Sequence, residues 1–314
     1  MLAHRKFKIG ILIVQLISIL PFLIFIFYLS DLWYEQRRDT IIEKNAVQAK
    51  QIGEIVSRSI QIGDILSSSL AYNPYFFGEP SANTGVFQKT LKKIVSDFPE
   101  IHNIIILNTE GEPVISDFDL TPDQKRENAS DRPYFQKVLK TKKTVVSEPL
   151  EGRITGANLV ILSSPVIIND KITAIINISY NLDNLKQNIE KTLTQNVPQS
   201  IFVLDSNKKV VFMPNKPLPD DKEKEAFLPL SLVPEMGKTV SIDNQKMPLF
   251  QGIAIGASYT LSYTGWTILS VQPISEAFAP LFIIQNSIWI IIIVSFLFAL
   301  LVISYFLRKA KIIL

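Results

Sequence analysis

Long apolar stretches at both ends of the chain enclose a central part with mixed patterning. Positions 9–30 carry no charged side chain across 22 residues, and positions 281–307 carry none across 27. A bilayer core of roughly 30 Å needs about 20 apolar helical residues. A spanning helix also tolerates an internal proline such as Pro21. We therefore predict transmembrane helices at 9–30 and 281–307.

Basic residues flank both apolar stretches on their outer sides. The segments 1–8 and 308–314 each hold three basic residues and no acid. Clustered Lys and Arg beside a span favour the cytoplasmic side. The first stretch exceeds the apolar core of about 7–15 residues in a cleavable signal peptide, and no small-residue cleavage site follows it. We therefore predict an uncleaved two-pass protein of the cell inner (plasma) membrane, with both termini cytoplasmic and the central domain periplasmic or extracellular.

The residues after the first span have the pattern of one long helix. Apolar residues recur with a helical period, and no proline occurs between Pro21 and Pro74. At about 1.5 Å per residue, a helix over 31–72 extends about 60 Å, which exceeds the length of one small domain. We expect a stalk helix over 31–71 that lies along two stacked modules. The same stripe is also compatible with a homodimer seam, and the pattern does not separate these interpretations.

A pattern typical of strands begins at Ile104. Residues 104–115 have four apolar residues, an Asn, a polar turn and a second apolar run, and residues 201–212 repeat this order 97 positions later with Asp for Asn. Recurrence at a fixed offset indicates tandem copies of one α/β module. The predicted fold class is therefore α+β. Further strands are predicted at 158–168, 171–180, 252–263 and 266–272, a helix at 182–194 and a loop at 214–234.

Charge and cysteine content exclude several classes of function. The net charge of +3 arises in the terminal segments, which hold six of the 32 basic residues and leave 26 against 29 acids in the central part. A weakly acidic domain has no basic footprint for nucleic acid. The chain has no cysteine, which excludes disulfides, thiolate catalysis and Cys-bound metals. The central domain must be stable through its apolar core alone.

Residues suited to catalysis are few. His4 lies in a predicted cytoplasmic tail, so a Ser-His-Asp or metal-histidine site would depend on His102 alone. No phosphate-binding loop and no HExxH pattern occurs. Acidic pairs such as Asp117 and Asp119 lie in polar loops and are most simply solvated. We predict no enzymatic activity, no catalytic or metal-binding residues and no cofactor.

The densest group of candidate residues is DRPYF at 131–135, with SEP at 147–149 and RITG at 153–156 after it. Asp131 suits the N-cap of a helix, and Pro133 suits its first turn. Capping does not explain Arg132 with two aromatic residues beside it. An Arg fork can clamp a carboxylate while aromatic faces wall the pocket. The alternative is an Arg paired with a surface acid and two aromatic residues in the core.

The order of these features along the chain is distinctive. A span and a long helix precede a strand-rich module with DRPYF and SEP-x(3)-R-x-TG, and a second module closes with TGWTILSVQP before the last span. Over about residues 31–280, this order resembles the double Cache (dCache) sensor family. The resemblance implies two PAS-like modules on the long helix, a membrane-distal one at 72–194 and a membrane-proximal one at 195–280. It also implies that a small ligand binds in the distal module.

An amino-acid-binding subgroup of that family carries Arg-x-Trp-Tyr, a later Tyr, and an Asp on the last strand of the distal module. The resemblance places Arg132 at the Arg that holds the ligand carboxylate, and it places Tyr134, Phe135, Leu150 and Asn177 at the Trp, the two Tyr and the Asp. An Asn supplies no charge to offset a desolvated ammonium. A carboxylate ligand therefore fits at least as well as an amino acid. The predicted ligand-binding residues are Arg132, Tyr134, Phe135, Arg153, Thr155 and Asn177.

The predicted function is small-ligand sensing and transmembrane signalling, as the input portion of a bacterial receptor of the chemotaxis, two-component histidine kinase or diguanylate cyclase type. We expect a homodimer in the membrane. Only seven residues follow the second predicted span, so we expect either a C-terminal output domain beyond this sequence or a separate cytoplasmic signalling partner. The alternative is a stand-alone membrane-anchored solute-binding or accessory subunit without its own signalling output.

Overall fold

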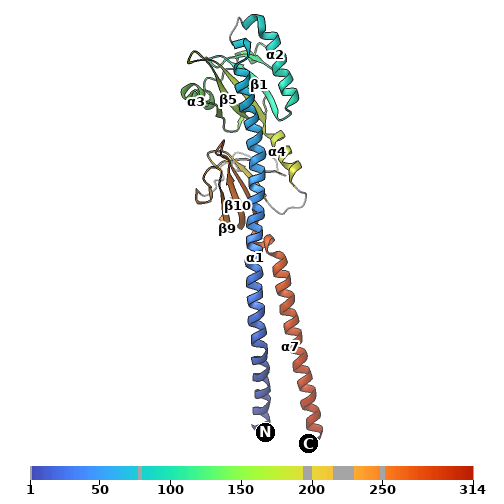
Figure 1. Ribbon diagram of the computed structural model, residues 1–314. Coiled ribbons are helices and arrows are strands. Elements are labelled where there is room, and N and C mark those ends of the chain that lie inside the picture. The colour runs from blue at the N-terminus through green and yellow to red at the C-terminus, as the bar shows by residue number, and fades with distance from the viewer. Residues whose placement is uncertain (1, 77–79, 194–199, 215–229, 248–251, 314) are drawn as a thin grey trace.

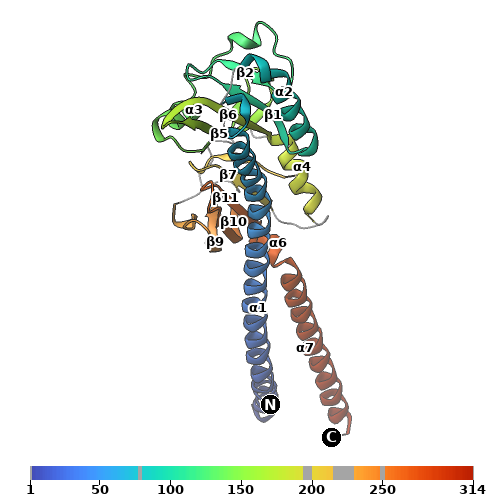
Figure 2. The ribbon, with the colours of Figure 1, turned by 45° about the horizontal axis from the view of Figure 1, so that its top comes forward.

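One long N-terminal helix runs past two antiparallel sheets in the computed structural model, which describes residues 2–76, 80–193, 200–214, 230–247 and 252–313 (Figure 1). The first helix, α1 (Leu2–Ala71), and the last, α7 (Ala279–Ile313), extend from the sheets in the same direction, so both ends of the chain lie at one end of the molecule (Figures 1 and 2). The prediction of an α+β fold with two sheet modules and a long N-terminal helix is confirmed.

The distal module, farther from the chain ends, is built on a six-stranded sheet of order β2-β1-β6-β5-β3, with β4 also paired to β5. The β5–β6 hairpin has nearly the predicted boundaries. Asn169 and Asp170 at its turn both have positive φ, which a two-residue type I′ turn requires. The elements of this module are β1 (Ile101–Leu107), β2 (Pro113–Ser116), β3 (Val145–Val146), β4 (Leu150–Glu151), β5 (Asn158–Ile168), β6 (Lys171–Asn181), η1 (Pro74–Phe76), α2 (Pro80–Asp97), η2 (Gln124–Arg126), α3 (Pro133–Thr141) and α4 (Leu182–Thr192).

The proximal module repeats the strand order of the distal one. Its five-stranded sheet has the order β8-β7-β11-β10-β9, in which an initial hairpin again pairs through its first strand with the last strand of the module. This correspondence supports the tandem repeat inferred from residues 104–115 and 201–212. Most of the predicted loop at 214–234 lies outside the described residues. The elements are β7 (Ser200–Leu204), β8 (Val210–Phe212), η3 (Leu230–Leu232), β9 (Thr239–Met247), β10 (Gly252–Thr260) and β11 (Thr267–Pro273).

Helix α1 joins the two modules through one buried stripe. It is continuous for 70 residues, or about 105 Å at 1.5 Å per residue. Ala49, Ile52, Val56 and Ile60 follow one another at intervals of three or four residues and are all at most 2% exposed. The stripe packs against β10 and β11 of the proximal sheet and against β5 and β6 of the distal sheet. This apolar stripe is therefore used within the chain.

The proximal sheet leads directly into the C-terminal helix. A short helix, α6 (Ile274–Ala277), follows β11, and the ring of Phe278 stacks on Tyr34 of α1 at 4.5 Å. Within α7, Ala279–Val302 is long and apolar enough to cross a membrane, with mean hydropathy 2.3 and none of it buried. Much of the predicted span at 9–30 lies outside the residues whose side chains are described. The two-pass topology therefore stays a prediction.

Candidate ligand-binding site

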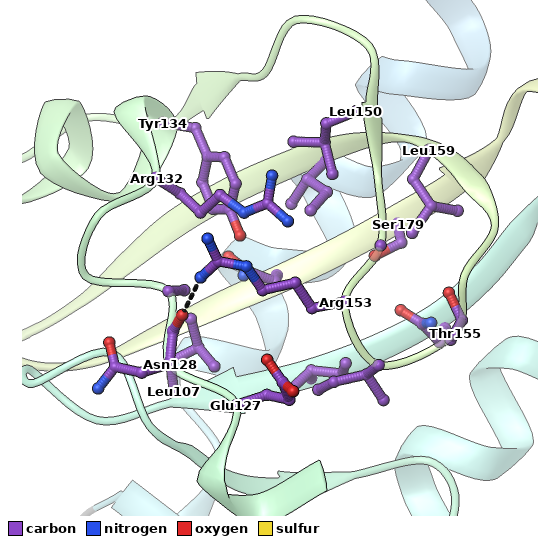
Figure 3. Close-up of a pocket in the computed structure, with 17 residues that line it drawn as sticks. Leu107, Glu127, Asn128, Arg132, Tyr134, Leu150, Arg153, Thr155, Leu159 and Ser179 are labelled. Carbon is purple, nitrogen blue, oxygen red and sulfur yellow. Dashed lines mark hydrogen bonds between the residues drawn. The ribbon is translucent and has the colours of Figure 1, made fainter.

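A pocket of about 60 Å³ lies on one face of the distal sheet, beneath the loops that flank α3 and β4. Figure 3 shows side chains from strands and loops that converge on it. Its described lining consists of Asn103, Ile105, Leu107, Glu127, Asn128, Ala129, Arg132, Tyr134, Leu150, Gly152, Arg153, Ile154, Thr155, Leu159, Ile161, Asn177 and Ser179.

The floor of the pocket follows from the alternation of side chains along three strands. Alternate residues of β1, Asn103, Ile105 and Leu107, point to the pocket, whereas Ile104 and Ile106 belong to the core that includes α1. Strands β5 and β6 alternate in the same way and supply Leu159, Ile161, Asn177 and Ser179. One face of the sheet therefore packs on α1, and the other forms the site.

Arg132 and Asp131 have different roles from those that capping predicts. Arg132 itself occupies the N-cap position of α3, and Pro133 follows as the first residue of the helix. The prediction of Asp131 as the N-cap is therefore wrong. Instead, Asp131 receives two hydrogen bonds from Arg153, Nη1 to Oδ1 at 2.7 Å and Nη2 to Oδ2 at 2.6 Å. These bonds from Arg153 hold the pKa of Asp131 below its usual range.

The two arginines of the site differ in whether a carboxylate pairs with their guanidinium group. Arg153 forms the bidentate pair with Asp131 and also donates to the carbonyl of Asn128. Arg132 donates from Nη2 to the carbonyl of Glu151 at 3.1 Å, and it forms no ion pair within the described part of the chain. Both guanidinium groups lie over the pocket (Figure 3). Arg132 is therefore the cation with donors left for an anionic ligand.

A buried network holds the inner wall. Tyr134 is 7% exposed, and burial raises the pKa of its phenol, which lies beside the side chain of Asn177. The hydroxyl of Ser163 donates to Oδ1 of Asn177 at 2.7 Å. These partners orient the Asn177 amide, because both of its neighbours sit on rigid elements, β5 and α3.

Asn103 is a site residue that the sequence analysis missed. Its side chain is 2% exposed, and neither Oδ1 nor Nδ2 has a hydrogen-bond partner among the described residues. A buried amide without partners is rare in native proteins. A detectable signal was present in the sequence, since Asn103 is the polar member of an alternating set with Ile105 and Leu107.

Five of the six predicted ligand-binding residues line this pocket: Arg132, Tyr134, Arg153, Thr155 and Asn177. Phe135 does not line it. Its side chain is 1% exposed and packs in the apolar cluster beneath α3 with Val138 and Ile175. The reason is helical geometry, because consecutive residues of α3 point in different directions. A role of the five in ligand binding stays a prediction.

Two sheet modules with the same strand order pack along one helix, and the pocket lies in the distal module. The Cache domain family matches residues 34–281, which is most of the chain. The chain therefore belongs to the Cache domain family in its double (dCache) form, and the resemblance seen in the sequence is confirmed.

The chain is similar in sequence to part of a kinase and in fold to solved extracellular domains. Sporulation kinase D of Bacillus subtilis (strain 168) is 26% identical over 179 residues, which cover 54% of this chain and 34% of that protein. The chain thus matches about a third of this relative. The extracellular domain of the histidine kinase rpHK1S-Z16 superposes with a TM-score of 0.58 at 16% identity, covering 76% of this chain and 95% of that one.

A chemoreceptor domain has a similar fold. The ligand-binding domain of the Pseudomonas fluorescens chemoreceptor CtaA, in complex with L-isoleucine, superposes with a TM-score of 0.56 at 16% identity, covering 79% of this chain and 97% of that one. At such low identity, the similarity establishes the fold alone.

Proposed function

We propose that this protein is the sensory-input portion of a membrane receptor and that its distal pocket binds a small carboxylate. The observation that carries the proposal is the guanidinium of Arg132, which lies over the pocket without an ion pair among the described residues. Apolar side chains of β1 and β5 wall the same pocket, and a few polar groups converge on it. Small-molecule sites commonly have this composition.

A route for the signal follows from the connections of the site. The distal module reaches the membrane end through α1, and the proximal module reaches it through β11, α6 and α7. A ligand shifts the balance between two arrangements only if it binds one of them more tightly. The proposal includes two membrane spans, a homodimer and an output domain or cytoplasmic partner that receives the signal.

The test of the site uses the full chain in detergent or nanodiscs and a thermal-shift screen of small carboxylates and amino acids. A ligand that binds only the folded state raises the Tm by mass action. Arg132→Ala should remove this shift. Arg126→Ala is the matched control, because Arg126 is exposed on η2 and does not line the pocket. An unchanged shift in Arg132→Ala would show that the anion binds elsewhere.

The test of signalling compares the chain with and without ligand. Cysteine pairs introduced into α1 and α7 near the membrane should form cross-links at rates that depend on ligand. A stand-alone binding subunit would bind the ligand with cross-linking rates that do not change. This second result would leave the binding site valid and would overturn the signalling role.

A further inference from the structure

The described floor of the distal pocket combines apolar side chains with a few polar ones and carries no charged side chain. Its hydrogen-bonding groups are Asn103 on β1 with Asn177 and Ser179 on β6. Among the described lining residues, the acid is Glu127, which belongs to the loop before α3, is exposed and interacts electrostatically with Arg153. A ligand that reaches the floor therefore meets amides and a hydroxyl, with cations at the mouth.

The two floor amides differ in their hydrogen bonds. Oδ1 of Asn177 accepts a hydrogen bond from Ser163, and its side chain lies beside the phenol of Tyr134. Asn103 is 2% exposed, and neither of its amide atoms has a hydrogen-bond partner in the part of the chain that the structure describes. Leaving both atoms unpaired is unfavourable, because the amide has lost its water without gaining another bond. A ligand group that supplies the missing bond would remove this penalty.

We propose that the second polar group of the ligand is an uncharged oxygen, a hydroxyl or a carbonyl, and that the Asn103 amide binds it. This inference rests on the proposed function, since Arg132 must hold the carboxylate. The Nδ2 of Asn103 donates to either oxygen type, and Oδ1 accepts from a hydroxyl. An ammonium would arrive with three donors and a full charge, and the floor offers no anion to replace its hydration. The favoured class is therefore small hydroxy or oxo acids.

Four three-carbon acids that differ only at the second carbon test this class: lactate, pyruvate, alanine and propionate. Each is titrated into the full chain in nanodiscs, with calorimetry and thermal shift as readouts. Lactate or pyruvate should bind at least tenfold more tightly than alanine and propionate. Tighter binding of alanine overturns the inference and leaves a carboxylate site at Arg132 intact. Binding of none of the four overturns the inference, while the wider screen above still tests the proposed function.

Asn103→Leu separates a ligand contact from a structural role. Leucine has a similar volume and removes the two unpaired atoms, so the ligand-free Tm should stay the same or rise while the preference for lactate or pyruvate over propionate disappears. Asn103→Ser, a smaller change, should weaken the same preference. A fall in the ligand-free Tm with the preference retained overturns the role of Asn103. Arg132→Ala should instead weaken binding of all the acids, which distinguishes loss of the carboxylate site from loss of selectivity.

Discussion

The hydroxyl of Ser206 donates a hydrogen bond of 2.7 Å to Oε1 of Glu148 and thereby joins the proximal module to the distal one. Glu148 lies between β3 and β4, two residues before Leu150 of the pocket wall. Its carboxyl also contacts that of Asp205, which is 3% exposed after β7. Loss of hydration, together with Asp205, raises the pKa of Glu148 to about 7. Lys137 and Lys208 also face this carboxyl and act in the opposite direction.

The junction between the modules should therefore weaken as the pH rises. In the unfolded chain a Glu carboxyl has a pKa of about 4.3, so the folded state binds the extra proton between about pH 4.3 and 7. Stability then falls as the pH rises through this window, and the full loss is present above it. Because solvent reaches Glu148 and screens its charge, the loss in the free energy of unfolding is limited to about 1 kcal/mol. Glu148→Gln should raise the Tm at about pH 8 by about 2–4 °C.

The measurement is the Tm of wild type and Glu148→Gln across about pH 5–8. Glu151→Gln serves as the control, because Glu151 is an exposed acid on the adjacent strand β4. A Tm difference that stays constant with pH in Glu148→Gln would contradict a titrating contact at the junction.

Gly63 of α1 permits a close contact with the distal sheet. The hydroxyl of Tyr180 donates to the carbonyl of Ser59 at 2.8 Å, and a Cβ at position 63 would lie 2.0 Å from that hydroxyl oxygen. Gly63→Ala should therefore destabilise the protein by about 1–3 kcal/mol, as overpacking does. A Cβ at Gly85 on α2 would have no heavy atom within 4 Å. Gly85→Ala should therefore stabilise the protein by about 0.5–1 kcal/mol. Urea unfolding measures both.

Removal of the tyrosine hydroxyl tests the origin of this effect. Gly63→Ala combined with Tyr180→Phe should recover part of the stability, because the nearest atom is gone. If the two changes are simply additive, the loss comes from another contact of α1.

Asn45 fastens α1 to the last strand of the proximal sheet. Ser270 of β11 donates to Oδ1 of Asn45 at 2.7 Å, and Nδ2 of Asn45 donates to the carbonyl of Ile41 at 2.8 Å. Both side chains are fully buried. Asn45→Ala should lower the free energy of unfolding by about 1–3 kcal/mol, because it leaves the Ser270 hydroxyl unpaired. Asn45→Ala made in the Ser270→Ala variant should lower the free energy of unfolding by less, because the hydroxyl is already absent. A double-mutant cycle that shows no coupling energy would contradict this hydrogen bond.

Asn177→Asp should change the ligand preference of the pocket. The new carboxylate keeps the acceptor for Ser163 and adds a negative charge to the floor. Binding of alanine should strengthen at least tenfold relative to lactate, and calorimetry measures both. Asn184→Asp is the control, since Asn184 lies on α4 and does not line the pocket. An unchanged ratio would show that the second group of the ligand does not reach Asn177.

Local signals predicted most of the secondary structure. The β5–β6 hairpin was placed to within one residue, because the Asn169-Asp170 turn and the flanking apolar runs act over short distances. Strand β9 (Thr239–Met247) was missed, because an edge strand with several exposed polar residues lacks an apolar signal. Helix α2 was also missed, and its N-terminal residues have no acid in the first turn to mark a start.

The candidate site was predicted less completely, because its electrostatics depend on tertiary contacts. Asp131 pairs with Arg153, 22 positions away, so local capping rules assigned it incorrectly. Arg132, which lines the pocket, was singled out in the sequence because helix capping does not explain an Arg beside two aromatic residues. The orphaned amide of Asn103 becomes apparent only when its neighbours on β6 are known.

Because α1 is one unbroken helix, it can transmit a displacement along its axis from the distal module to the first residues of the chain. Its backbone hydrogen bonds resist stretching, so a displacement of its distal end along the helix axis moves the first residues of the chain by the same distance. Helix α7 continues from the proximal sheet through β11 and α6, and the ring of Phe278 just before it stacks on Tyr34 of α1. Any change in the height of α7 relative to α1 must therefore rearrange this ring contact.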